Sequence, residues 1–164
     1  MKKIIVIGCP GGGKSTFSRK LHNITGIPLH HLDMLFWNSD KTTVEKDVFL
    51  ERLTAVLKED EWIIDGNFQS SLEMRLAACD TVFFLDYPTE LCLEGIRERR
   101  GKARSDIPWI ETEEDGEFME FIKKFNEQQR PIVKELLERC GDKSIFTFNS
   151  REAADEFLNS QEDG

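Results

Sequence analysis

The chain has 164 residues, of which 39% are hydrophobic, and it carries a formal net charge of -9. At this length one domain with a substantial core is the default, so we expect a single domain over residues 1–164. The acidic balance argues against nucleic acid as a partner, because such partners are held by many lysines and arginines on phosphates. No apolar run approaches the ~18 residues of a membrane span, so no membrane partner is expected.

The cysteines and histidines indicate neither a disulfide framework nor a metal site. His30 and His31 are adjacent, but no third ligand lies at a metal-binding spacing. The four cysteines form no C-x-x-C pair, and we interpret them as reduced thiols, mostly core filler, in a cytoplasmic protein. They are Cys9, Cys79, Cys92 and Cys140.

Short apolar runs alternate with helical patterns along the whole chain. We expect Gly26 to end the first helix, Thr89 to be an N-cap with Gly101 as the matching C-terminal residue, and Ser150 to cap the last helix. Pro131 should kink or break a long amphipathic pattern. The predicted strands are 3–8, 28–34, 61–66, 80–88 and 143–148, and the predicted helices are 14–23, 44–58, 70–79, 89–100, 116–139 and 150–158. Strands this apolar, separated by helices, predict a three-layer α/β fold with a parallel sheet covered on both faces.

The segment GCPGGGKS, residues 8–15, matches the P-loop pattern G-x-x-x-x-G-K-[ST] and lies between a predicted strand and a predicted helix. Its glycines allow backbone N–H groups to face a phosphate at the positive end of the helix. Lys14 would reach the β- and γ-phosphates, and the Ser15 hydroxyl would bind Mg²⁺. A glycine-rich turn with an incidental lysine is disfavoured by this context, so we expect ATP and Mg²⁺ as cofactors. The predicted nucleotide-binding residues are Gly8, Gly11, Gly12, Gly13, Lys14, Ser15 and Thr16.

Three apolar segments end in aspartate, at Asp33, Asp65 and Asp86. The carboxyl ends of parallel strands meet at one edge of an open sheet, where ligands bind. One of these carboxylates is therefore expected near Mg²⁺ and another near an acceptor hydroxyl, although each could instead be a turn or cap residue.

The residues resemble the nucleoside monophosphate kinase group of P-loop proteins, of which adenylate kinase is the best known. The resemblance rests on five segments in order along the chain: GCPGGGKST, DMLF, IIDGNF, FLDYPTEL followed by IRERR, and FTFNSREAADEFL. The sequence is also similar to a bacterial group of adenylate-kinase-related proteins called DNA topology modulation proteins. The resemblance implies a five-stranded sheet of order 2-3-1-4-5 and a small lid at about residues 101–118.

The resemblance also implies roles for individual residues. Asp65 would hold metal-bound water, and Arg99 and Arg100 would stabilise the transferring phosphoryl group. The alternative for this basic segment, which includes Arg97, Lys102 and Arg104, is that it complements a helix C-terminus. The segment after Arg100 would close over the phosphates with Lys102, Arg104 and Arg130, although a surface role for Arg130 is favoured.

The sequence departs from adenylate kinases where they hold the AMP phosphate. The two clamping arginines are replaced by Phe36 and Gln69, and Arg75 is a candidate substitute. Phe36, Trp37 and Phe68 would instead offer apolar and stacking surface, and Asp33, Asn67 and Gln69 would offer hydrogen bonds. The arginine that faces the adenine is replaced by Gly95, with Arg97 as its candidate substitute.

These patterns favour a small-molecule kinase that transfers the γ-phosphoryl group of ATP to a nucleoside, nucleotide or other hydroxyl acceptor. The proposed catalytic residues are Lys14, Asp33, Arg99 and Arg100, with Asp33 orienting or deprotonating the acceptor hydroxyl. Two alternatives remain open: a nucleotide-dependent protein acting on DNA topology, and an NTPase without an acceptor.

Overall fold

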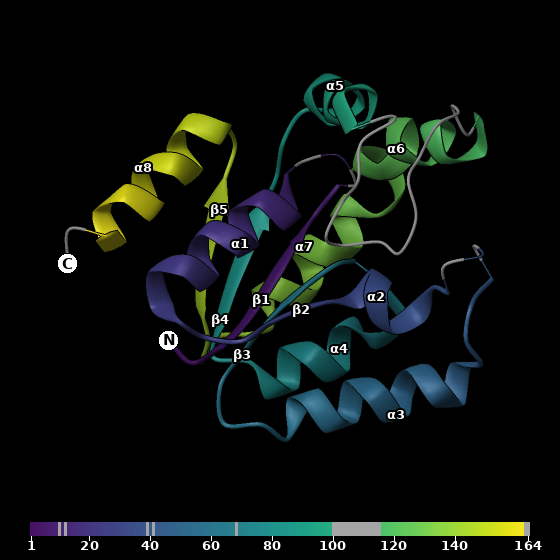
Figure 1. Ribbon diagram of the computed structural model, residues 1–164. Coiled ribbons are helices and arrows are strands. Elements are labelled where there is room, and N and C mark those ends of the chain that lie inside the picture. The colour runs from purple at the N-terminus through teal and green to yellow at the C-terminus, as the bar shows by residue number, and fades with distance from the viewer. Residues whose placement is uncertain are drawn as a thin grey trace.

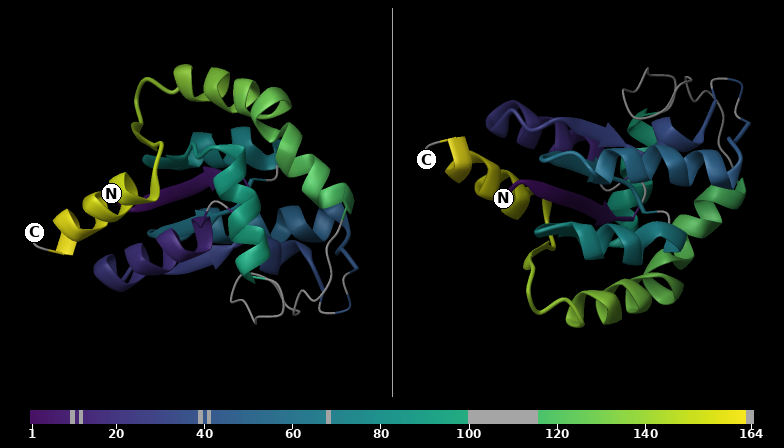
Figure 2. Two further views of the ribbon diagram at one scale, coloured as in Figure 1. Left: turned by 90° about the horizontal axis from the view of Figure 1, so that it is seen from above. Right: turned by 90° about the horizontal axis from the view of Figure 1, so that it is seen from below.

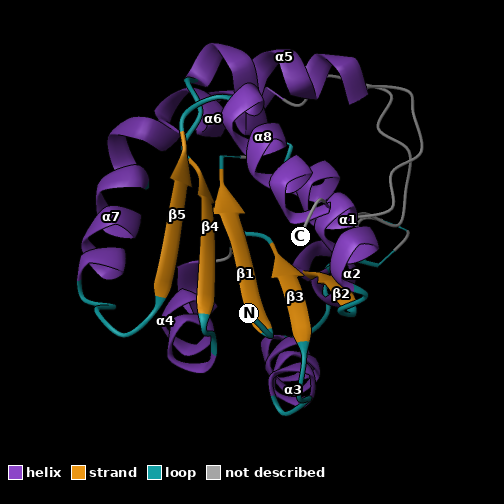
Figure 3. Ribbon diagram, turned by 90° about the vertical axis from the view of Figure 1, so that its left-hand side faces the viewer, coloured by secondary structure: helices purple, strands orange, loops and turns teal. Residues whose placement is uncertain are grey.

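The computed structural model describes residues 1–9, 11, 13–38, 40, 42–67, 69–99 and 116–162. Its sheet has the parallel strands in the order β2-β3-β1-β4-β5, which confirms the expected topology (Figure 3). The strands are β1 (Lys3–Gly8), β2 (Leu29–His31), β3 (Trp62–Asp65), β4 (Thr81–Leu85) and β5 (Ser144–Phe148). The three central strands β3, β1 and β4 are buried almost throughout, as their continuous apolar runs predict.

Helices cover both faces of this sheet (Figures 1 and 2). They are α1 (Lys14–Thr25), α2 (Leu32–Phe36), α3 (Lys46–Leu57), α4 (Gln69–Ala78), α5 (Thr89–Arg99), α6 (Gly116–Gln128), α7 (Arg130–Glu138) and α8 (Arg151–Glu162). Alternate residues of β1 enter different core clusters. The cluster of Ile4 includes side chains of α1, α5, α6 and α8, and the cluster of Ile5 includes side chains of α3, α4 and α7. Within the described residues, no helix is both long enough and apolar enough to cross a membrane.

The amphipathic pattern of residues 116–139 forms two helices, as Pro131 predicts. Gln129 separates them, and Pro131 lies in the first turn of α7, where its missing N–H costs no helical hydrogen bond. Phe125 of α6 and Val133 of α7 belong to the two different core clusters. The break therefore carries the chain from one face of the sheet to the other.

Two local predictions need correction. Residues 28–34 do not form one strand, because β2 ends at His31 and Leu32 begins α2, packed against Gly66 where a side chain would not fit. Helix α5 begins at Thr89 itself, so Thr89 is not the residue before the helix. The Thr89 hydroxyl accepts a hydrogen bond from Asn126 of α6.

The predicted cap of the last helix is confirmed. Ser150 caps α8, since its Oγ accepts from the N–H of Ala153. Gly101 lies outside the described residues.

Candidate active site

The predicted P-loop follows β1 at the carboxyl edge of the sheet and leads into α1. Gly8 has φ 153°, and a Cβ there would lie 2.6 Å from the carbonyl oxygen of Leu85. Gly11 has φ 84°, and a Cβ there would lie 2.1 Å from the carbonyl oxygen of Cys92. The loop is therefore pressed against β4 and α5 at two points that only glycine allows.

Lys14 begins α1 and reaches back over the loop. Its Nζ donates to the carbonyl oxygens of Gly8 at 3.0 Å and Cys9 at 3.2 Å. Gly13 is the left-handed N-cap of α1, and Ser15 lies half-buried in the first helical turn. An ammonium group and the positive end of a helix thus meet at one loop, which is the arrangement that binds phosphate.

The other predicted nucleotide-binding residues include Thr16 and Gly12. Thr16 is exposed, and its Oγ1 accepts a hydrogen bond from Arg19 at 3.4 Å. Gly12 lies outside the described residues, so both roles stay predictions.

Asp65 ends β3, next to β1, and is buried. In the strand register it faces Val6 of β1 on one side and His31 of β2 on the other. The Nδ1 atom of His31 lies 2.7 Å from Oδ2 of Asp65. No partner was predicted for His31, although both residues end strands that the topology places side by side.

Arg75 of α4 is fully buried and supports the loop after β3. Its guanidinium donates to the carbonyl oxygens of Gly66 and Asn67 and to Oγ of Ser71. Burial lowers the pKa of Arg75 to about 10, against the opposing effects of Cys79 and Asp65. Its suggested role as an acceptor clamp is therefore wrong for this conformation, because the guanidinium is hydrogen-bonded to the loop and buried.

Asn67 connects the same loop to the P-loop. Its Oδ1 accepts a hydrogen bond of 3.1 Å from the N–H of Gly8. Asn67 thus holds the start of the P-loop, a contact that its predicted role as a hydrogen-bonding group for the acceptor did not include.

Phe36 is half-buried and packs against two aromatic rings. Its ring contacts Phe49 of α3 edge-on at 5.3 Å between ring centres, and Trp37 at 5.5 Å. Phe36 thus anchors α2 on α3, and the stacking role expected for it stays a prediction. Phe68 and the side chain of Gln69 lie outside what the structure describes.

Gly95 brings the backbone of α5 directly onto the P-loop. A Cβ at this position would lie 2.1 Å from the carbonyl oxygen of Gly11 and 3.4 Å from Nη2 of Arg151. An arginine at position 95 would displace the loop, which gives the departure from adenylate kinases a physical reason. Its suggested substitute, Arg97, is exposed on α5.

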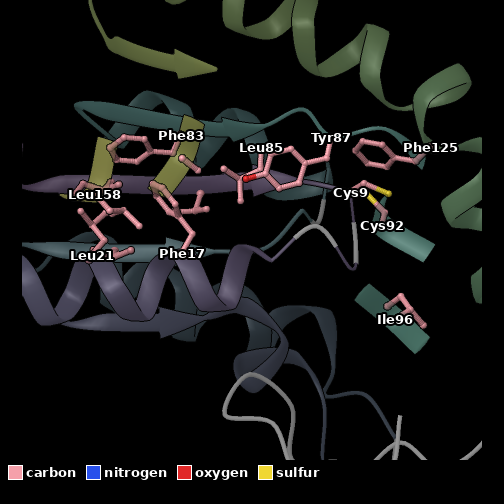
Figure 4. Close-up of a cluster of buried hydrophobic side chains, with 14 of the residues drawn as sticks. Cys9, Phe17, Leu21, Phe83, Leu85, Tyr87, Cys92, Ile96, Phe125 and Leu158 are labelled. Carbon is pink, nitrogen blue, oxygen red and sulfur yellow. The ribbon is translucent and has the colours of Figure 1, made fainter. Parts of the chain in front are cut away.

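Buried thiols complete this contact between loop and helix. Cys9 of the P-loop and Cys92 of α5 point their sulfur atoms toward one another (Figure 4), and the hydrogen bond between them raises the pKa of Cys9. All four cysteines are free, and three of them, Cys9, Cys79 and Cys92, are buried. The prediction that they are mostly core filler is confirmed.

Asp86, at the carboxyl end of β4, forms an ion pair with Arg130. Arg130 forks onto its two carboxylate oxygens at 2.7 and 2.8 Å, and this pairing raises the pKa of Arg130. The suggested lid role of Arg130 is therefore corrected, since Arg130 ties the start of α7 to the end of β4.

Of the remaining predicted catalytic residues, the structure describes Asp33 in full and only the backbone of Arg99. Asp33 lies half-buried in the first turn of α2, two residues beyond β2, at the same edge of the sheet as Asp65. Arg99 ends α5, and its side chain is not described. Arg100 and lid residues 101–115 lie outside the described residues, while 116–118 begin α6.

The oxygen donors at this edge fit Mg²⁺ bound to a nucleotide. Ser15 offers a hydroxyl and Asp65 a buried carboxylate, and Mg²⁺ is held by few protein oxygens together with phosphates and water. In the described part of the chain no three or more His, Cys, Asp or Glu gather as a metal site. The Ser15 hydroxyl and the Asp65 carboxylate are oxygen donors of the kind that complement phosphates around Mg²⁺.

Similarity to known proteins is low in sequence. No family model matches the chain. It is 26% identical over 122 residues to an adenylate kinase of Thermotoga maritima, which covers 70% of this chain and 54% of the relative. It is 30% identical over 91 residues to an adenylate kinase of Thermotoga petrophila, which covers 54% of this chain and 40% of the relative. The chain thus spans about half the length of the curated relatives it matches.

Solved structures match over nearly the whole chain. Shikimate kinase from Acinetobacter baumannii, in complex with shikimate, has a TM-score of 0.63 at 19% identity and covers 98% of this chain and 92% of its own. A gluconokinase from Sinorhizobium meliloti has a TM-score of 0.60 at 14% identity, with coverages of 98% and 89%. The chain therefore has the fold of the P-loop kinases, with the strand order expected from its resemblance to nucleoside monophosphate kinases.

Proposed function

We propose that this protein is a small-molecule kinase that transfers the γ-phosphoryl group of ATP to a hydroxyl acceptor. The observation that carries the proposal is the junction of β1 and α1, where Lys14 folds over a glycine loop beside the buried carboxylate of Asp65. The sequence relatives are adenylate kinases, and the structural neighbours are kinases of shikimate and gluconate by name. Both comparisons support phosphoryl transfer to a small molecule.

In the proposed reaction, Lys14 and the N–H groups of the loop hold the β- and γ-phosphates. Ser15 and, through water, Asp65 would hold Mg²⁺, which supplies charge neutralisation and alignment of the phosphates. Asp33 takes the proton of the acceptor hydroxyl. The hydroxyl oxygen forms a bond to the γ-phosphorus. The bond between the γ-phosphorus and the β–γ bridging oxygen breaks, and ADP leaves. Arg99 and Arg100 stabilise the charge on the transferring group.

The acceptor in this proposal is a nucleoside or another hydroxyl compound, not AMP. The two arginines that clamp AMP in adenylate kinases are replaced, and Phe36 is packed against Phe49. Arg75, the candidate substitute, is buried against the carbonyls of the 66–67 loop. Phe36 and Arg75, the two of these residues whose side chains are described, therefore offer no clamp for a second phosphate.

The test is a coupled assay of ADP release from Mg·ATP, with nucleosides, nucleoside monophosphates, shikimate and gluconate as acceptors. We expect one hydroxyl acceptor to raise ADP release at least about tenfold above the acceptor-free rate, because water reacts poorly in a site built for transfer. Lys14→Ala should abolish this release. Lys20→Ala is the matched control, since Lys20 lies exposed on the same helix and pairs with Asp155.

Two results would contradict the proposal. ADP release that no acceptor accelerates would favour an NTPase. Rapid turnover with AMP would contradict only the exclusion of AMP as acceptor, which rests on positions 36 and 69. The proposed kinase activity would stand.

A further inference from the structure

Asp65 has a role in the proposed phosphoryl transfer, and its partner His31 has none so far. Both side chains are nearly covered, with 10% and 7% of their surface exposed, and they lie 2.7 Å apart at the edge where the P-loop begins. We propose that His31 is a positioning residue of the nucleotide site, which fixes the Asp65 carboxylate for the water shell of nucleotide-bound Mg²⁺. This inference rests on the proposed function, because it assigns His31 to the same site.

The chemistry of the pair sets the direction of the hydrogen bond. An ionised carboxylate only accepts, so Nδ1 of His31 carries the hydrogen and donates to Oδ2 of Asp65. A buried carboxylate is costly unless it is hydrogen-bonded, and the imidazole provides such a bond. Holding Oδ2 also fixes the plane of the carboxylate and with it the direction in which Oδ1 presents its lone pairs. Groups that orient a metal-binding side chain in this way commonly tune metal affinity.

The position of the pair in the sheet connects it to the donor loop. Strand β3 lies between β2 and β1, so Asp65 has His31 on one side and Val6, two residues before Gly8, on the other. The loop after Asp65 also contacts the P-loop, where Asn67 accepts from the N–H of Gly8. His31 thus orients the carboxylate of Asp65, which lies beside the strand that leads into the P-loop.

The neighbouring histidine is an internal comparison. His30 lies on the same strand, and its Nε2 is 3.4 Å from the half-exposed carboxylate of Glu59. It therefore shares the local backbone and residue type of His31 but does not contact Asp65. This makes His30→Ala a matched control.

The experiment titrates the full chain with a fluorescent ATP analogue, once with Mg²⁺ and once with EDTA. For His31→Ala we expect the tightening of binding by Mg²⁺ to fall about tenfold relative to the unsubstituted protein, with affinity in EDTA unchanged. His31→Asn should recover most of the effect, because its amide can donate to Oδ2 of Asp65. His30→Ala should retain the full effect. Thermal unfolding without nucleotide identifies variants that fold, and His31→Leu replaces His31→Ala if the latter does not.

The outcomes separate this inference from the proposed function. If Lys14→Ala abolishes binding while the His31 variants keep the full Mg²⁺ effect, the nucleotide site stands and the inference about His31 is overturned. Equal loss of affinity in Mg²⁺ and EDTA would also overturn it, because that pattern indicates a general structural defect. If the unsubstituted protein binds no nucleotide, the proposed function fails, and the role of His31 fails with it.

Discussion

Arg75 shows how a single buried residue supports the site without contacting a ligand. Its guanidinium is 0% exposed and serves the carbonyls of Gly66 and Asn67. We expect Arg75→Met to lower the free energy of unfolding by about 3 kcal/mol, because methionine fills the space but removes the guanidinium donor from the carbonyls of Gly66 and Asn67. Nucleotide affinity should also fall, since Asn67 holds Gly8. Urea unfolding and titration with the fluorescent ATP analogue measure the two effects.

Arg139→Met is the control for this prediction. Arg139 is an exposed helical arginine paired with Glu135 at i,i+4, a surface pair worth about 0.5 kcal/mol or less. If the two substitutions destabilise the protein equally, the supporting role assigned to Arg75 is incorrect.

The site residues that could be predicted from the sequence are those that belong to one short motif. The glycines, Lys14 and Ser15 lie within eight positions of one another, so a motif suffices to place them. His31 and Arg75 were missed or misassigned because their partners are 34 and 9 positions away and are brought together only by the sheet and the loop beyond β3. Such contacts are set by tertiary packing, which periodicity does not encode.

Among the elements, the contact between the P-loop and α5 is the most constrained. A Cβ at Gly95 would lie 2.1 Å from the carbonyl oxygen of Gly11, and this neighbour is backbone, which cannot rotate away. We expect Gly95→Ala to weaken nucleotide binding at least tenfold and to cost about 2 kcal/mol of stability, because overpacking outweighs the better helix propensity of alanine. Binding of the fluorescent ATP analogue and urea unfolding test this.

Gly141→Ala provides the comparison, since nothing lies within 4 Å of a Cβ at that position. It should change stability by less than about 0.5 kcal/mol and leave binding unaltered. Unimpaired nucleotide binding by Gly95→Ala would mean that the loop moves freely away from α5.

The elements themselves were largely predictable, because strong local signals agree with the fold. Apolar runs mark the three central strands, and Pro131 marks the break between α6 and α7. The prediction was weakest at β2, an edge strand of three residues whose end depends on Leu32 packing against Gly66. The pairing of Arg130 with Asp86 was likewise beyond reach, since it joins helices and strands 44 positions apart.

For the molecule as a whole, the strand order followed from the resemblance to nucleoside monophosphate kinases, while the strand and helix alternation alone predicted only a parallel sheet. The sheet order matters for function because it sets β3 beside β1. Asp65 and the P-loop consequently meet at one edge, although 57 positions separate Asp65 from Gly8.

The overall charge bears on the alternative that the protein acts on DNA. With a net charge of -9, the chain as a whole repels a polyanion, although residues 97–104 include five lysines and arginines that could meet phosphates. We expect a labelled duplex to show no change in fluorescence anisotropy up to roughly 10 µM protein at 150 mM salt, where nonspecific DNA-binding proteins begin to bind. The measurement is repeated at low salt and with Mg·ATP, to include a nucleotide-dependent state. Binding that weakens with salt and survives Lys14→Ala would instead establish a DNA-binding surface independent of the P-loop, and the kinase proposal would then describe only part of what the protein does.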